Sequence, residues 1–482
     1  MALQLHSTLT RRKLPFAPLA DGKVGMYLCG PTVYSDCHIG HLMGPVLFDA
    51  VARWFAVRGF QVRFVNNITD IDDKIIDKAN ATGEPWQAIT ERYTNQYLEL
   101  LKKLHVTTIT DHPRCTEYVP QMVSYIEDLV ARGRAYVAGD GVYYDVSRQV
   151  GYGKLSGRRL DEMTADAGKL DRMAGAAGGV RHPADFALWK LAKPGEPSWP
   201  SPWGDGRPGW HIECSVMSLH TLGATFDIHA GGEELKFPHH ENEIAQGEAH
   251  GGDYARHWMH NNLVQYQGAK VSKSDPRMSD PAFALQFQAK AVVAAHGPAV
   301  VRFLLLNGHY RRPVDFSPEN IGAVATALGR LHRVVAADLE KTSDLSLEAI
   351  LAILLPDEAS RHRADFVAAM DDDFNTGAAI AELFGLAHLL GKLPADQQPA
   401  VRTVVWGLGR LIGLFQPGDA AAVPAAADDD RLAKVMSLVL ELRASARANR
   451  DFAASDRIRD RLKAAGIVVK DGKDGATWEF AP

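Results

Sequence analysis

Cysteine is scarce in this chain of 482 residues, which contains four: Cys29, Cys37, Cys115 and Cys214. So few cysteines exclude a disulfide-stapled secreted scaffold, and free thiols or metal ligands in a reducing compartment are expected instead. The chain also lacks any run of about 18 consecutive apolar residues, which argues against a membrane-spanning helix. The segment from Met1 to Arg12 has no apolar core of the kind found in secretory signals. We therefore expect a cytoplasmic protein without a membrane partner.

A strong excess of charge is absent as well. The chain has 53 basic and 58 acidic residues and a formal net charge of −5, which argues against a protein coated in nucleic acid. A local basic face could still bind a nucleic acid. The apolar fraction of 46% and the charged fraction of 23% are ordinary for a soluble globular enzyme. The length exceeds that of one ordinary domain, so we expect three or more.

The first strongly patterned region predicts a strand, a helix and a second strand. Residues 24–29 read as a buried strand, residues 41–58 carry apolar side chains at helical spacing, and residues 61–65 read as another strand. A strand–helix–strand unit of this length predicts a parallel sheet. Residues 225–230 return to strand character, and Pro238 is expected to open a helix, a position that proline favours.

From about residue 283 onward the pattern is almost entirely helical. Helix spacing recurs at 321–339, 378–390 and 401–414, and a low-complexity linker follows at 417–427. The tail has two further helical patterns and then two short strand patterns. We expect an α/β catalytic domain in two halves, 1–120 and 206–282, separated by an insertion over 121–205. Two helical regions should follow, over 283–330 and 331–416, and then a mixed α/β tail over 428–482.

Two short motifs far apart in the chain point to phosphate chemistry. His38-Ile39-Gly40-His41 stands at the start of the predicted helix, where free backbone N–H groups and the helix dipole favour phosphate. Gly40 permits close approach of a nucleotide, and two imidazoles one turn apart can both donate to phosphate oxygens. The alternative is that His38 and His41 are ordinary polar cap residues.

The second motif is Lys270-Val271-Ser272-Lys273-Ser274, in a polar loop. Lysine offers a point charge that can follow a departing pyrophosphate, and such a loop is expected to close on ATP. A solvated basic turn is the alternative for this motif taken alone. The two motifs together, in this order, indicate a site built around the triphosphate of ATP.

A set of four side chains predicts a metal beside that site. His239 and Glu243 are four residues apart and share a helix face. Cys29 ends the first strand, at the edge where a parallel sheet presents its ligands, and Cys214 is the second thiol. Two thiolates, one imidazole and one carboxylate suit Zn²⁺. Two neighbouring histidines remain open as rival ligands: His211 and His240.

These motifs closely resemble those of cysteinyl-tRNA synthetases, which are class I aminoacyl-tRNA synthetases, and the resemblance runs nearly end to end. It rests on MYLCGPTVY (26–34), HIGH (38–41), NNITDIDDKII (66–76), PADFALWK (183–190), GRPGWHIECS (206–215), FPHHENEIAQ (237–246), KVSKS (270–274), MDDDFNT (370–376) and DFAASDRIRDRLKAAGI (451–467). The family loop reads KMSKS, and Val271 replaces its methionine, so both lysine roles should survive. The stretch 165–181 is less typical of the family, and nothing is carried over there.

The resemblance implies a Rossmann-like class I catalytic domain with an insertion, a stem-contact helical region over 283–330 and a helical bundle for the anticodon arm over 331–416. It also implies site residues. They are Cys29, Cys214, His239 and Glu243 for one Zn²⁺; His38, Gly40, His41 and Lys273 for ATP, with Asp227 and Gly231 facing the adenosine; Lys270 and Lys273 for the transition state and the pyrophosphate; and Thr32, Thr69 and Trp210 for the amino acid.

The implied reaction activates L-cysteine with Mg²⁺-ATP to cysteinyl-adenylate and passes the cysteinyl group to the 3′ end of cysteine tRNA, in a monomeric enzyme. Shape alone would separate cysteine from serine by only about 10–200-fold. Zinc prefers thiolate, so we expect it to recognise the substrate thiol and to make an editing domain unnecessary.

Two rival functions can be compared with this one. The first is a cysteine ligase that transfers the same adenylate to a small amino-sugar, and the second is a zinc- and nucleotide-binding regulator without catalysis. The helical region and tail beyond residue 320 favour the tRNA enzyme over the first rival. In that tail Arg443, Arg447 and Arg450 share one helix face that could track phosphates or could simply be solvated. The intact phosphate motifs argue against the regulator.

Overall fold

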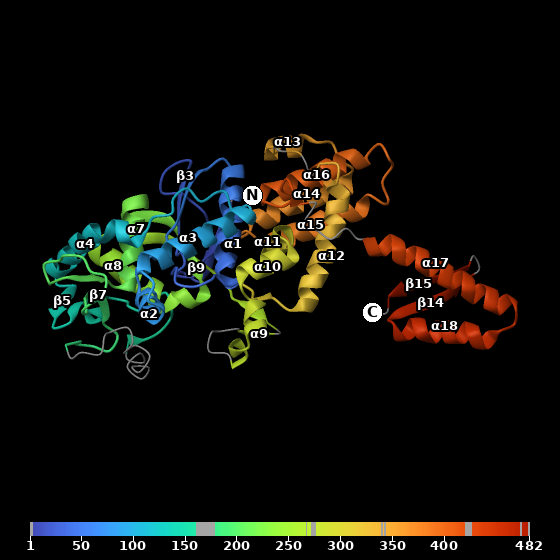
Figure 1. Ribbon diagram of the computed structural model, residues 1–482. Helices are drawn as coiled ribbons and strands as arrows, with labels where there is room; N and C mark the ends of the chain where they lie inside the picture. Colours follow the sequence, from blue (N-terminus) through green and yellow to red (C-terminus); the bar gives the residue numbers. More distant parts are fainter. Residues whose placement is uncertain are drawn as a thin grey trace. The chain divides into compact units, whose positions relative to one another are not determined.

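The computed structural model describes residues 3–160, 179–266, 268–270, 276–338, 341, 344–419, 427–472 and 475–480 (Figure 1). The chain forms two compact units, residues 1–423 and 424–482. Within the described ranges no single helix is long and apolar enough to cross a membrane. Among the described helices, one consecutive pair passes that length and composition test together: Ala289–His296 and Pro298–Leu306, bent by 108° to each other.

The larger unit contains a four-stranded parallel sheet in the order β10-β9-β3-β4. Its strands are β3 (Lys23–Leu28), β4 (Gln61–Asn66), β9 (Thr225–Gly232) and β10 (Tyr254–Asn261). The chain leaves β3 for β4 on one side and later returns to β9 on the other. This reversal places a topological switch point at the carboxyl end of β3, where parallel sheets bind ligands.

Helix α1 (Gly40–Val57) connects β3 to β4, so the predicted strand–helix–strand unit is confirmed. Most of its side chains are buried because α1 packs against the sheet on one side and against the helical region on the other. Trp54 and Phe55 contact Phe366 and Phe374 through their rings, which joins the two regions in one hydrophobic core. The helix that carries the first phosphate motif is therefore held from both sides.

The insertion between β4 and β9 has a sheet of its own, antiparallel in the order β5-β6-β7-β8 (Figure 1). Its strands are β5 (Ala135–Ala138), β6 (Gly141–Tyr144), β7 (Phe186–Leu191) and β8 (Gly206–Pro208). The helices before and after this sheet are α2 (Asp73–Thr82), α3 (Trp86–Lys103), α4 (Val119–Ala131) and α7 (Trp210–Leu222). Of the less typical stretch 165–181, only residues 179–181 are among those described.

The helix expected to open at Pro238 begins later. A one-turn segment, Lys236–His240, comes first, and α8 runs from Glu241 to His250. Phe237 has extended backbone angles of φ −139° and ψ 130°, as expected for a residue that precedes proline. The regular helix therefore starts three residues after Pro238, although His239 and Glu243 still lie on consecutive turns.

The remainder of the larger unit is helical, as the sequence predicts. The helices expected at 321–339, 378–390 and 401–414 are α12 (Pro318–Val335), α15 (Thr376–Leu389) and α16 (Gln398–Leu411). The other helices there are α9 (Pro281–Leu285), α10 (Ala289–His296), α11 (Pro298–Leu306), α13 (Leu347–Ala352) and α14 (Asp357–Asp371). Short strands complete the unit: β1 (Gln4–Ser7), β2 (Arg12–Pro15), β11 (Val264–Tyr266), β12 (Ala269–Lys270) and β13 (Val314–Asp315).

The smaller unit has the predicted mixed α/β character. Helices α17 (Ala427–Ala448) and α18 (Phe452–Ala464) precede an antiparallel pair of strands, β14 (Ile467–Gly472) and β15 (Gly475–Phe480). The finer boundaries expected within the larger unit stay predictions.

Candidate functional site

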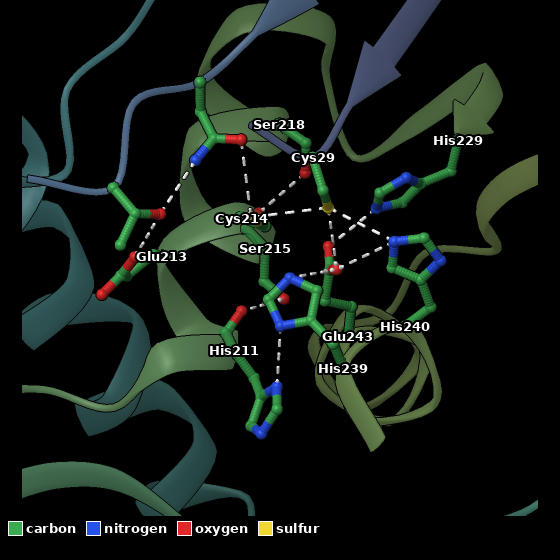
Figure 2. Close-up of polar contacts among 12 residues, drawn as sticks. Cys29, His211, Glu213, Cys214, Ser215, Ser218, His229, His239, His240 and Glu243 are labelled. Carbon is green, nitrogen blue, oxygen red and sulfur yellow. Dashed lines mark hydrogen bonds and ion pairs between the residues drawn. The ribbon is translucent and has the colours of Figure 1, made fainter. Parts of the chain in front are cut away.

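Four ligand-type side chains converge beyond the carboxyl end of β3 (Figure 2). Cys29 follows β3 directly, Cys214 lies on α7, and His239 and Glu243 come from the turn before α8 and from its first turn. Their ligand atoms all lie within 4.8 Å of one another. The sequence could not show this convergence, because three distant segments supply the four residues.

The separations within this group are close to those of a tetrahedral zinc site, and one of them is slightly shorter. The Cys29 and Cys214 sulfurs are 3.7 Å apart, Cys29 Sγ is 3.5 Å from Glu243 Oε1, and His239 Nε2 is 3.1 Å from the same oxygen. Metal–ligand bonds of about 2.0–2.3 Å place tetrahedral ligands about 3.3–3.8 Å apart. The residues present therefore fit Zn²⁺ in both chemistry and spacing.

The electrostatics of the group favour a cation. Burial alone would raise the pKa of Glu243, but His229 and His239 outweigh it and hold that pKa well below its usual range. Burial would also raise the pKa of Cys214, yet the hydrogen bond from Cys29 and the charge of His239 bring it down to about 6. Burial opposes a charge on His239, but Glu243 and Cys214 raise its pKa to about 10. Burial, followed by Cys214 and Glu243, raises the pKa of the Cys29 thiol well above its ordinary value. A bound dication would therefore displace protons from Cys29 and His239.

The two rival histidines hold different positions. His211 Nδ1 lies 3.0 Å from His239 Nδ1, on the side of that ring away from Glu243. His240 Nε2 lies 3.3 Å from Cys29 Sγ and 4.0 Å from Glu243 Oε1. Among the described residues, a second group within 4.8 Å combines Cys29 and Glu243 with His229 and His240, and neither group contains His211.

A cavity of about 720 Å³ joins this cluster to the first phosphate motif. Cys29, Trp210, His38, Gly40 and His41 all contribute to its lining. The two motif imidazoles stack with their centroids 3.7 Å apart. Each accepts a backbone hydrogen bond at Nδ1, His38 from the N–H of Gly40 and His41 from the N–H of His38, both at 3.1 Å. A cavity of this size can hold a nucleotide and an amino acid side by side.

Comparison with known proteins assigns the chain to a family. Residues 15–326 match the class I (C) catalytic domain of tRNA synthetases, residues 365–416 a DALR domain, and residues 431–478 the cysteinyl-tRNA ligase anticodon-binding domain. Cysteine–tRNA ligase from Pseudomonas paraeruginosa is 43% identical over 99% of this chain and 100% of its own length. The chain belongs to the cysteinyl-tRNA synthetase family. The ligase from Chromohalobacter salexigens is 44% identical, over 99% of each chain.

Solved class I synthetase structures share the fold. Mycobacterium tuberculosis methionyl-tRNA synthetase bound by methionyl-adenylate superposes with a TM-score of 0.59 at 16% identity, over 83% of this chain and 93% of that one. A putative arginyl-tRNA synthetase from Campylobacter jejuni gives 0.51 at 12% identity, over 82% and 94%. The resemblance, the class I fold and the assignment to cysteine–tRNA ligases are confirmed.

The residues expected at the amino-acid pocket lie near the metal cluster of this synthetase. Trp210 is the first residue of α7, and its ring centroid is 4.3 Å from that of His239. Thr32 lines the cavity and forms an isolated parallel bridge with Thr69. Thr69 is buried and donates from Oγ1 to Glu213 Oε2 at 3.1 Å. Their roles with the substrate stay predictions.

The two residues expected to face adenosine lie toward opposite ends of β9. Asp227 lies toward its start, where its two carboxylate oxygens accept hydrogen bonds from the backbone N–H groups of Leu19 and Gly25 at 2.7 and 2.8 Å. Gly231 lies at the carboxyl end, packed against the His240 ring. Neither is among the described residues that line the cavity, and both assignments stay predictions.

The lysine motif lies largely outside the described residues. Lys270 ends strand β12, but its side chain and the whole of Lys273 are not described. The predicted roles of both lysines therefore stay predictions.

Three residues near the metal cluster were not predicted from the sequence. His229 Nε2 lies 2.8 Å from Glu243 Oε2, and the Tyr254 hydroxyl donates to the same oxygen at 2.6 Å. His260 Nε2 lies 2.8 Å from His240 Nδ1. These residues come from β9 and β10, so no spacing relates them to Glu243 or His240. The available signal was weak: His229 lies in the predicted strand 225–230, whereas no strand was predicted over the segment that holds Tyr254 and His260.

Proposed function

We propose that this chain activates L-cysteine with Mg²⁺-ATP and transfers the cysteinyl group to the 3′ end of cysteine tRNA, with zinc selecting the substrate thiol. The single observation that carries the proposal is the shared cavity. Cys29 of the metal cluster and both histidines of the phosphate motif line it, so a thiol-recognising site and a nucleotide site adjoin. The proposal places the enzyme in the cytoplasm as a monomer.

The four cluster residues would hold one Zn²⁺ through two thiolates, one imidazole and one carboxylate. Bound zinc supplies a soft acceptor for the thiolate of the substrate. With zinc bound, Cys29, Cys214 and Glu243 would carry three negative charges against two positive ones, so a fourth anion would bind reversibly. A serine hydroxyl does not ionise readily enough to compete. Trp210, beside His239, would cover the bound side chain.

In the activation step the cysteine carboxylate attacks the α-phosphate of ATP. A bond forms between a carboxylate oxygen and the α-phosphorus, and the bond from that phosphorus to the bridging oxygen breaks, so pyrophosphate leaves with the electron pair. His38 and His41 at the start of α1 would donate to phosphate oxygens, and Lys270 and Lys273 would stabilise the pyrophosphate. Positioning and charge stabilisation supply the rate enhancement.

In the transfer step the terminal ribose hydroxyl of tRNA attacks the cysteinyl carbonyl. An ester bond forms to the carbonyl carbon, the bond from that carbon to the phosphate oxygen breaks, and AMP leaves with the electron pair while the hydroxyl proton is released to solvent. Gly40 would permit close approach of the nucleotide, Asp227 and Gly231 would face the adenosine, and Thr32 and Thr69 would border the amino acid. The helical region and the smaller unit would contact the tRNA. The match of residues 431–478 to an anticodon-binding domain supports this assignment.

Two assays on the purified chain test the function. Cysteine-dependent ATP–pyrophosphate exchange should be followed by transfer of labelled cysteine to tRNA. Exchange without transfer would support a small-molecule ligase, and absence of exchange would support a non-catalytic regulator. Replacing Lys273 with alanine should depress exchange far more than cysteine binding, and equal loss of both would refute its role.

A further inference from the structure

A chain of three polar contacts leads from Cys29 away from the cavity. His240 Nε2 lies 3.3 Å from Cys29 Sγ, and His240 Nδ1 lies 2.8 Å from His260 Nε2. On its other side, His260 Nδ1 lies 2.8 Å from the Thr8 hydroxyl oxygen. Both imidazoles are buried, with 0% of His240 and 3% of His260 exposed. The candidate metal ligand is therefore connected to the N-terminal segment by a continuous set of hydrogen bonds.

The donors and acceptors in this chain can be assigned. The facing nitrogens of His240 and His260 are 2.8 Å apart, so a single hydrogen lies between them and one ring donates to the other. A neutral imidazole has one donor nitrogen and one acceptor nitrogen, so the donor order can run in one of two directions. A metal-bound Cys29 is a thiolate, which can only accept.

That constraint selects one order. His240 Nε2–H donates to the Cys29 sulfur, so His240 Nδ1 must accept from His260 Nε2–H. His260 Nδ1 then accepts from the hydroxyl of Thr8, which is free to rotate. This is the order that fills all three bonds when Cys29 is a thiolate, and in it His240 Nε2 has no lone pair to offer a metal.

The fold also fixes the position of the His240 ring (Figure 2). A Cβ atom on Gly231 would lie 2.6 Å from His240 Cε1 and 2.9 Å from Nε2, so the ring edge occupies the space that only glycine leaves there. The ring centroids of His229 and Trp258 are 4.6 and 5.3 Å away on other sides. The Nε2 edge is thus held beside Cys29 by packing as well as by hydrogen bonding.

We propose that His240 is a positioning residue that determines how strongly the metal binds the substrate thiol. Its Nε2–H withdraws charge from the Cys29 thiolate, so zinc receives less charge from its protein ligands and accepts more from the substrate sulfur. The same bond fixes the orientation of Cys29. This inference rests on the proposed function and deepens it. In it His240, a rival ligand in the sequence analysis, does not bind the metal itself.

Two substitutions at one position test the proposal. In His240→Asn the amide reproduces the Nδ1 position and keeps the partner of His260, but it does not reach Cys29. In His240→Gln the longer amide places an N–H near the Nε2 position. His250→Asn, at the far end of the following helix α8, is the matched control, because the half-buried His250 ring pairs with Asp128 at 2.9 Å and not with the metal cluster.

The variants are purified with cobalt in place of zinc, and the thiolate-to-cobalt charge-transfer band is recorded beside the steady-state constants. A hydrogen bond to sulfur lowers the energy of its donating electrons, so His240→Asn should shift the band to longer wavelength. Its KM for cysteine in pyrophosphate exchange should rise about 10-fold, the lower end of effects caused by losing such partners of metal ligands. The KM for ATP should stay constant, and His240→Gln should restore both readouts toward wild type.

Several results would overturn the proposal. If His240→Asn leaves both the band and the cysteine KM unchanged, the hydrogen bond to Cys29 is excluded. If His240→Gln changes both readouts as much as His240→Asn does, the donor role of His240 is excluded. Loss of the metal from His240→Asn, with retention in His239→Asn, would make His240 the ligand instead. If His240→Asn does not fold, His240→Gln is compared with Thr8→Val, which removes the last donor of the chain. The charge-transfer band of Thr8→Val must then shift further from wild type than the band of His240→Gln does. Failure of the proposed function looks different, since wild-type protein itself would then bind no metal or show no exchange.

Discussion

Replacing Arg302 with methionine should destabilise the larger unit strongly, because Arg302 forms a buried ion pair with Asp49 of α1. Arg302 Nη2 lies 2.5 Å from Asp49 Oδ2, and its guanidinium also donates to the backbone oxygens of Leu104 at 2.9 Å and Ile412 at 3.1 Å. The pair therefore joins α1, which begins at Gly40 of the phosphate motif, to α11 and to the end of α16.

The expected magnitude follows from what each change leaves behind. Removing one partner of a buried ion pair costs about 3–5 kcal/mol. After Arg302→Met, Asp49 keeps Arg53 at 2.8 Å and the N–H donors of Thr107 and Thr108, so we expect the lower end, about 3 kcal/mol. Asp49→Asn leaves the guanidinium facing an amide, and the double variant should cost about 2 kcal/mol less than the sum of the single variants.

Urea unfolding followed by circular dichroism measures these differences. Arg63→Met is the matched control, because the side chain of Arg63 is 53% exposed in its pair with Asp111 and should change stability by less than about 1 kcal/mol. The reasoning would be refuted if the stability losses of the two single variants simply added up to that of the double variant. It would also be refuted if Arg302→Met cost as little stability as Arg63→Met.

The same pair has a pH dependence whose sign can be stated. Burial alone would raise the pKa of Asp49, but Arg302 and Arg53 outweigh it and lower that pKa below its ordinary value. The contribution of the ion pair to the free energy of unfolding is therefore complete above the unfolded-state pKa of Asp49, about 3.9. That contribution is lost as the pH falls through the lower folded-state pKa. The stability deficit of Arg302→Met should shrink below about pH 4, and a deficit that grows there would contradict the assignment.

Three further substitutions have definite expected outcomes. A Cβ at Gly30 would lie 1.6 Å from the backbone oxygen of Asn67, so Gly30→Ala should displace Cys29 and abolish metal binding by elemental analysis, whereas Gly391→Ala, with open space around it, should not. Gly231→Ala should push His240 from Cys29 and raise the cysteine KM about as much as His240→Asn, and an unchanged KM would contradict the packing argument. Glu241 accepts from the N–H groups of Gly153, Leu155 and Ser156, so Glu241→Ala should cost about 1–3 kcal/mol and speed proteolysis of that loop; unchanged cleavage would argue against the anchor.

The sequence predicted those parts of the fold that local periodicity determines. The β3–α1–β4 unit and helices α12, α15 and α16 were expected within a few residues of their observed ends, because each buries a regular stripe of apolar side chains. The start of α8 was wrong by three residues, because the backbone before Pro238 is extended and the turn after it is irregular. Helix propensity does not encode such a turn.

The candidate site was predictable only in part from residue spacing. His239 and Glu243 share a helix face, and Cys29 ends a predicted strand, so local rules could propose those three. Cys214 had no spacing signal; it was proposed as the second thiol from its residue type alone, and the resemblance to a family then implied the same ligand. His229 and Tyr254 contact Glu243 from other strands, and contacts of that kind depend on strand order, which one sequence does not show.

Elemental analysis of the purified chain, combined with pyrophosphate exchange for cysteine and serine, tests most directly whether a metal selects the substrate. We expect one zinc per chain and a preference for cysteine well above the roughly 200-fold that shape alone can give. Removal of the zinc with a chelator should abolish that preference, and added zinc should restore it. A chain that binds no metal and activates serine as readily as cysteine would contradict zinc-based selection.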